Sequence, residues 1–147
     1  MEPKELEKYS FLWSEIRLII AAIALFLGGI PPIYKIMPYD AFGGLVGILL
    51  KLCWIISGAT ALYLLYKWNK SGQKLFNEKD PKDLITFIVL IVSGVNLGIA
   101  GLLGNNIGMS MIPYDSRSLI FIIVGAIYLF AAYNLFIKWQ KNSNKLF

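Results

Sequence analysis

Four long apolar runs, separated by short polar segments, divide the chain. The runs cover residues 11–30, 44–66, 84–103 and 118–137. Each has close to the ~20 residues that an α-helix needs to cross the hydrocarbon core of a bilayer. The pattern predicts an all-α protein, an integral membrane four-helix bundle that occupies residues 1–147 as a single domain.

The flanks of the first run indicate a retained helix rather than a cleaved signal peptide. A mixture of acidic and basic residues precedes it, from Glu2 to Lys8, and no small-residue cleavage site follows it. Pro31 and Pro32 then end the helix, because proline supplies no backbone N–H group. We therefore expect the first run to stay in the protein as a membrane span.

Composition supports the membrane interpretation and argues against a nucleic-acid partner. Hydrophobic residues make up 57% of the chain and charged residues 16%, whereas soluble domains contain about a quarter charged residues. The net charge is +5, but the basic residues flank the apolar runs instead of forming one basic stripe. We expect no nucleic acid to bind.

The basic residues also predict an orientation, because lysine and arginine gather on the cytoplasmic side of membrane proteins. Only Lys35 and Arg117 lie in the second and fourth polar segments. The first, third and fifth polar segments, with the adjoining helix turns, hold most of the others: Lys4, Lys8, Arg17, Lys67, Lys70, Lys74, Lys79, Lys82, Lys138, Lys141 and Lys145. This distribution predicts a multi-pass protein of the plasma (inner) membrane with both termini in the cytoplasm.

The two halves of the chain share sequence elements. Residues 66–76 and 137–147 both contain Lys-Trp, two further lysines and a final Leu-Phe at matching positions. The tripeptide Pro-Tyr-Asp occurs at residues 38–40 and again at 113–115, before the second span of each half. We interpret residues 1–76 and 77–147 as tandem repeats of one helical hairpin. Because each repeat has two spans, the copies would have the same orientation in the membrane.

The shared residues have mainly architectural interpretations. Asp40 and Asp115 are placed to cap the following helices by accepting hydrogen bonds from free backbone N–H groups. Alternatively, the two aspartates form an outer mouth that attracts cations. Trp68 and Trp139 are interpreted as interface anchors, with neighbouring lysines facing anionic lipid headgroups.

Ionisable and amide side chains within the spans are candidates for a pore or substrate site. Lys51 lies in the second apolar run, where it either snorkels to the nearer membrane surface or faces a pore or substrate. Asn96, in the third run, either lines such a path or forms a hydrogen bond between helices. Glu15 and Arg17 are interpreted as boundary residues at the cytoplasmic edge of the first span.

Glycines mark expected helix contacts. Gly94, Gly98 and Gly101 recur at helical spacing and share one face, and Gly104 and Gly108 form a further small-xxx-small pair. Glycine allows helix backbones to approach closely in lipid, where the usual hydrophobic drive is missing. The glycines indicate packing within the bundle or, alternatively, a homo-oligomer interface.

The residue types give no support for catalysis. The chain has no histidine and one cysteine, Cys53, which lies in an apolar run. No pair of acids lies within the four runs, and no glycine-rich nucleotide-binding loop is present. We expect no catalytic residues, no metal and no cofactor, and hence no enzyme.

Three functions stay open on the sequence alone. The first is a non-catalytic membrane component, either an oligomeric scaffold or an accessory subunit of a larger membrane complex. The alternative is a small channel or carrier for ions or small solutes that acts as a homo-oligomer. A third is a lipid-interacting protein that holds anionic headgroups through its lysine clusters.

Overall fold

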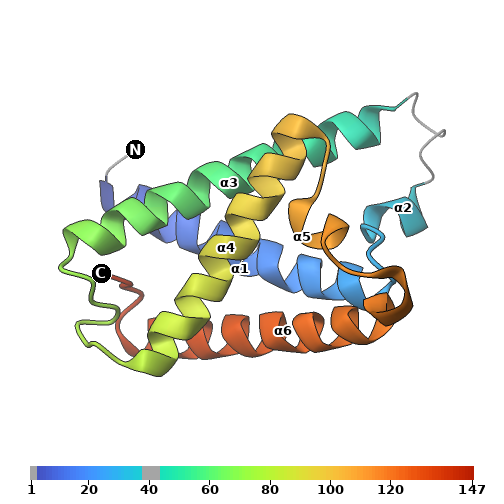
Figure 1. The fold of residues 1–147 in the computed structure, drawn as a ribbon. Helices are drawn as coiled ribbons and strands as arrows, with labels where there is room; N and C mark the ends of the chain where they lie inside the picture. The colour runs from blue at the N-terminus through green and yellow to red at the C-terminus, as the bar shows by residue number, and fades with distance from the viewer. Residues whose placement is uncertain (1–2, 38–43) are drawn as a thin grey trace.

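A computed structural model describes residues 3–37 and 44–147 of the chain. Within these ranges the fold is all-helical, and four helices are long and apolar enough to cross a membrane. They are α1 (Pro3–Phe26), α3 (Leu45–Lys70), α4 (Pro81–Leu103) and α6 (Arg117–Lys141). Figure 1 shows that they pack into one bundle, with α3 and α6 on opposite sides. The protein is thus a multi-pass membrane protein.

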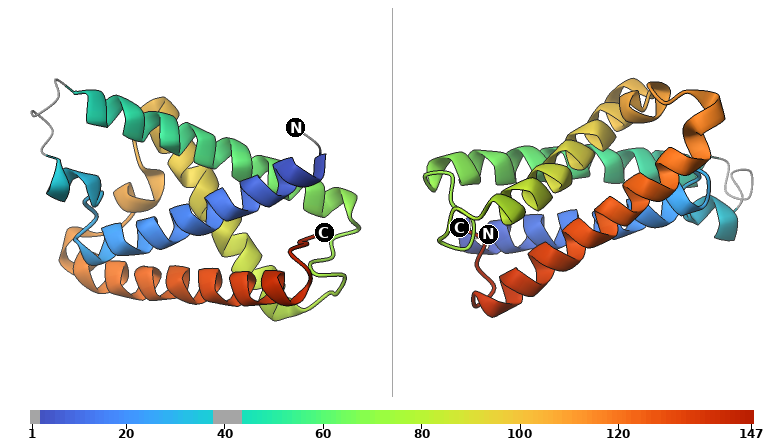
Figure 2. Two further views of the ribbon diagram at one scale, coloured as in Figure 1. Left: turned by 180° about the vertical axis from the view of Figure 1, so that it is seen from behind. Right: turned by 60° about the horizontal axis from the view of Figure 1, so that its bottom comes forward.

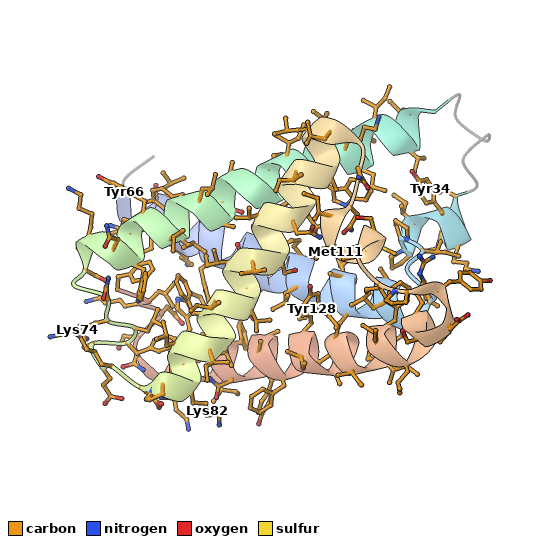
Figure 3. The ribbon with its side chains drawn as sticks, in the orientation of Figure 1. Tyr34, Tyr66, Lys74, Lys82, Met111 and Tyr128 are labelled. Carbon is orange, nitrogen blue, oxygen red and sulfur yellow. The ribbon has the colours of Figure 1, made fainter. Side chains whose placement is uncertain are left out.

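The two ends of the bundle differ. Both chain termini and the α3–α4 connection lie at one end, which we call the termini end, in every view (Figure 2). The opposite end carries the short helices α2 (Ile33–Ile36) and α5 (Ile107–Ser110) and the 3-10 turn η2 (Tyr114–Ser116). Lys74 and Lys82 lie at the termini end, whereas Tyr34 and Met111 lie toward the opposite end (Figure 3).

The helices extend beyond the predicted apolar runs, mainly at the termini end. Helix α1 begins at Pro3, because polar residues continue the helix before the apolar run, and it ends at Phe26 before two glycines with positive φ. Helix α4 begins at Pro81, and the Asp80 side chain caps it by accepting from the Lys82 backbone N–H at 2.9 Å. Proline is favoured there, since the first helical N–H has no intrahelical partner.

Helices α3 and α4 form the most extensive helix contact, which depends on glycine. A Cβ atom added to Gly98 would lie 2.7 Å from the Gly58 Cα atom, and one added to Gly94 would lie 2.6 Å from the Ala61 Cβ. A Cβ atom added to Gly101 would likewise meet the backbone of α3, 2.9 Å from the Lys51 carbonyl oxygen. Gly94, Gly98 and Gly101 therefore lie in the contact between α3 and α4.

A hydrophobic core fills the termini end. Phe11 of α1 stacks against Trp139 of α6 with ring centroids 5.3 Å apart, and Trp68 of α3 packs against Phe87 of α4 at 6.0 Å. The loop after α3 joins this core through Phe76, whose backbone N–H donates to the Leu146 carbonyl at 2.8 Å. The two Leu-Phe segments that match in sequence thus lie side by side.

Helices α3 and α6 end with the same backbone geometry. The Gln73 N–H donates to the Trp68 carbonyl at 3.0 Å, and the Asn144 N–H donates to the Trp139 carbonyl at 3.0 Å. In each case the preceding residue is left-handed, with φ 74° at Gly72 and 55° at Ser143. This is the Schellman arrangement that commonly ends helices. The tandem duplication itself stays a prediction.

Candidate functional site: a buried carboxyl beside an apolar groove

One face of α1 places polar side chains inside the bundle. Ser10, Ser14 and Arg17 recur at helical spacing, and all three are buried. The Arg17 guanidinium is 6% exposed. Its Nη1 donates to the Ser93 Oγ at 2.7 Å, and its Nη2 donates to the Leu90 carbonyl at 2.7 Å. Arg17 therefore fastens α1 to α4.

Weaker polar contacts connect α1 to α3 at a similar level. The Trp13 Nε1 donates to the Ser57 Oγ at 3.1 Å, and the Ser57 hydroxyl donates to the Cys53 carbonyl at 2.7 Å. The Ser14 hydroxyl lies 3.5 Å from the Thr60 hydroxyl. The bundle interior at this level is thus occupied by protein side chains that satisfy one another.

Glu15 and the Nε of Arg17 are exceptions to this satisfaction. Glu15 is 3% exposed, and neither carboxyl oxygen accepts a hydrogen bond within the described part of the chain. No ion pair joins Glu15 to Arg17, although the two residues are close in sequence. The ion pairs found among the described residues involve other acids. A buried polar group without a partner costs several kcal/mol, roughly 2–7 depending on the reference state.

Glu15 lines an apolar groove of about 560 Å³ between α1 and α6. The two walls have helical spacing: Leu12, Glu15, Ile16 and Ile19 on α1, and Leu129, Ala132, Tyr133 and Phe136 on α6. Several of these side chains are exposed, so the groove opens on the outer surface of the bundle. The groove is thus open from the side that would face lipid. Figure 3 shows the side chains on the ribbon, with Tyr128 of α6 labelled.

A second polar cluster joins α4 to α6 near the termini end. Asp83 is fully buried, accepts from the Asn134 Nδ2 at 3.1 Å and forms an ion pair with the Lys138 Nζ. The same ammonium reaches the Asp80 Oδ2 at 2.9 Å. The hydrogen bond from Lys138, and then that from the Lys82 backbone, hold the pKa of Asp80 below its usual range.

The structure does not bring Lys51 and Asn96 together. Lys51 is exposed on the outside of α3. Asn96 instead faces the short helix α5: its Nδ2 donates to the Asn106 Oδ1 at 2.8 Å, and its Oδ1 accepts from the Gly108 backbone N–H at 3.0 Å. Asn96 therefore holds the loop after α4, and pore lining by either residue stays a prediction.

The structure does not show the predicted helix caps, and it separates the two glycines of the second pair. Asp40 lies outside the described residues. Asp115 is exposed in η2, and α6 begins after Ser116 without a side-chain cap hydrogen bond. Gly104 ends α4 with φ 71°, whereas Gly108 belongs to α5, so the two glycines do not share one helix. The polypeptide turns between them because α4 stops at Leu103.

The two predicted anchor tryptophans lie at helix ends, with their rings packed in the core of the termini end. Trp139 is 6% exposed and Trp68 is half-buried. Exposed lysines surround this end instead: Lys4, Lys8, Lys70, Lys74, Lys79, Lys82, Lys141 and Lys145. Trp139 consequently has little surface left for lipid, and anchoring by Trp68 stays a prediction.

Sequence reasoning missed the buried polar residues. Glu15 and Arg17 were interpreted as boundary residues, but both side chains are buried because α6 and α4 pack against α1. The recurrence of Ser10, Ser14 and Arg17 on one helical face was a signal for a buried polar stripe. Asp83 had no comparable signal, since only the position of α6 makes it buried.

No protein-family model, curated protein or solved structure matches the chain. Among residues 3–37 and 44–147, no group of acidic and cysteine side chains has an arrangement suited to a metal ion. The site must therefore be interpreted from its own chemistry, which is that of an unsatisfied acid in the wall of an apolar groove.

Proposed function

We propose that the protein is a non-catalytic accessory subunit or scaffold that assembles with other membrane-spanning helices in the plasma membrane. One observation carries the proposal: Glu15 is buried without a partner in the wall of a groove that opens on the outside of the bundle. Ionisable residues within membrane spans ordinarily pair with another group. A second protein in the groove would supply the missing partner.

The packing of the interior also favours assembly over transport. The two terminal nitrogens of Arg17 donate to Ser93 and to the Leu90 carbonyl, and the glycine face of α4 packs closely against α3. Such contacts fix the helices against one another. They support a rigid bundle whose outer surface, rather than its axis, does the binding.

In this proposal both termini and the α3–α4 connection lie in the cytoplasm. The exposed lysines at the termini end support this orientation, since lysine is enriched on the cytoplasmic side. They also provide a surface for anionic lipid headgroups. Equal binding of the protein to neutral and anionic vesicles would contradict the lipid contact without affecting the assembly role.

A flux measurement tests the proposed function. The purified protein is reconstituted alone into vesicles, and the movement of protons and potassium ions is followed with entrapped dyes, with an ionophore as the positive control. We expect flux equal to that of protein-free vesicles. Protein-dependent flux of either ion would overturn the proposal and favour the second candidate.

The second candidate is a small carrier or channel that acts as a homo-oligomer. It is favoured by the two ionisable side chains buried in α1, because such residues also mark ion and substrate paths. If flux is found, Lys51→Leu and Asn96→Leu test the predicted lining residues. Unchanged flux in both variants would leave Glu15 and Arg17 as the remaining candidates.

A further inference from the structure

We propose that the occupant of the α1–α6 groove is a transmembrane helix of a different protein, with a lysine or arginine within its span that pairs with Glu15. This inference rests on the proposed function and names the chemistry of the partner.

The groove has the dimensions of a seat for a helix. On α1 the wall runs from Leu12 to Ile19, and on α6 it runs from Leu129 to Phe136. Each wall therefore covers seven residues of rise, roughly 10 Å or two helical turns. Ala132 contributes a small side chain between two larger ones, which deepens the α6 wall. Two facing helical walls of this kind accept a third helix.

Glu15 lies within the membrane-spanning helix α1 and not beyond its ends. Helix α1 has 24 residues from Pro3 to Phe26, and Glu15 lies at its midpoint, about 18 Å from its start. A helix that crosses beside it would therefore meet Glu15 within its own span. A basic residue there is costly in lipid unless it finds an acid. The two unfavourable groups would thus stabilise one another.

Glu15 has no hydrogen bond and no ion pair among the described residues. Arg17 is the nearest cation in sequence, but its two terminal nitrogens donate to Ser93 and to the Leu90 carbonyl, and its Nε does not reach a hydrogen-bond acceptor. Lys67 pairs with Glu7, and Lys138 pairs with Asp80 and Asp83. An added cation in the groove would therefore be attracted by Glu15 without competing for an existing pair.

A second copy of the chain is a poorer occupant. A symmetric contact through the groove would bring two Glu15 carboxyls together. The outward faces of α1 and α6 beside the groove offer only apolar side chains and Tyr133. Lys51 is exposed on α3, which does not line the groove, so a symmetric contact through the groove would not bring it to Glu15.

Model peptides test the proposal directly. Three apolar Leu/Ala transmembrane peptides have uncharged polar ends and differ only in a central Lys, Leu or Glu. The protein carries a donor dye at Lys145→Cys in a Cys53→Ala background, and each peptide carries an acceptor dye. Energy transfer in vesicles of neutral lipid then gives the association constant for each peptide.

We expect the lysine peptide to associate about tenfold more strongly than the leucine peptide, the upper range of polar contacts between helices in membranes. The glutamate peptide should associate least. In Glu15→Leu the lysine preference should disappear, and in Glu15→Gln it should be strongly reduced. The comparison of the three peptides with the unsubstituted Glu15 protein needs no variant, so a misfolded Glu15→Leu protein would not prevent the test.

Equal association of the lysine and leucine peptides would overturn the proposal. So would Glu15-dependent energy transfer between two copies of the protein that excludes the lysine peptide, because the occupant would then be a second copy. Either result would overturn only the identity of the occupant. The assembly function would be overturned by ion flux in the reconstitution experiment.

Discussion

In the ion pair between Asp83 and Lys138, the buried carboxylate depends on its cation. Asp83 is completely buried, whereas Lys138 is partly exposed and also reaches Asp80. Replacing Lys138 by methionine leaves the Asp83 carboxylate buried with only the Asn134 amide and no charge partner. We expect the unfolding free energy to fall by about 3 kcal/mol, because an uncompensated buried charge is expensive.

Unfolding in detergent by increasing denaturant measures this effect, with Asp80→Asn as the matched control. The control removes the exposed member of the same cluster and should cost much less. If Lys138→Met and Asp80→Asn destabilise the protein equally, the buried pair does not have the importance that its geometry indicates.

Asp80 gives the cluster a defined pH dependence. Its pKa is lowered in the folded protein by the hydrogen bond from Lys138, relative to an ordinary value of about 3.9. Its contribution to stability is therefore complete above that ordinary value and is lost as the pH falls through the lowered one. An NMR titration of Asp80 should show this pKa move upward in Lys138→Met. An unchanged titration would contradict the contact.

At the scale of elements, the ends of α3 and α6 have the same geometry but different residues. Gly72 adopts positive φ without strain, whereas Ser143 pays for the same conformation. We expect Ser143→Gly to stabilise the protein by about 0.5–1 kcal/mol and Gly72→Ala to destabilise it by about 1 kcal/mol. Both sites are exposed, and no atom lies within 4 Å of a Cβ added to Gly72.

Thermal unfolding of the two variants checks this expectation, and the opposite signs are its distinctive feature. A general effect of glycine on chain flexibility would instead destabilise Ser143→Gly. That outcome would show that the helix ends do not adopt the same left-handed conformation.

In the α3–α4 contact, adding a single methyl group should reduce stability more than the substitutions at the helix ends. In Gly98→Ala the added methyl group would meet the Gly58 backbone at 2.7 Å, and backbone atoms cannot rotate away. We expect a loss of about 1–3 kcal/mol as the helices separate. Val92→Ala on the outer face of the same helix is the control and should change stability little. Equal effects in the two variants would exclude a close α3–α4 crossing.

At the scale of the whole molecule, the sequence is most informative about the spans. Long apolar runs specify four helices because backbone groups in lipid must be satisfied within the helix. The interior was harder to predict, as Arg17 and Lys51 illustrate. Both are single cations in apolar surroundings, yet Arg17 is buried between α1 and α4 while Lys51 is exposed on α3. Only the packing of the helices decides which face is inside.

The candidate site was unpredictable for the same reason. Glu15 comes close to the start of its apolar run, where an acid is usually exposed to water. It becomes buried because α6 returns from the distant end of the chain and packs against α1. For Asn96 the sequence left open a pore-lining role and a hydrogen bond between helices, and its partners in the structure are Asn106 and Gly108 at the start of the short helix α5. The sequence pattern identified these polar residues within the spans, but it did not predict which residues they contact.

Occupancy of the groove is measured most directly by carbene labelling from the lipid phase. A photoactivated, lipid-dissolved diazirine is applied to the host's native membranes and to the purified protein reconstituted alone, and labelled residues are mapped by mass spectrometry. Ile16 in the groove and Val92 on the outer face of α4 are 58% and 61% exposed in the isolated chain, so they form a matched pair. We expect both to be labelled in the reconstituted protein and only Val92 in native membranes, because a partner helix covers Ile16. Equal labelling of Ile16 in the two preparations, relative to Val92, would contradict a helix-docking role for the groove.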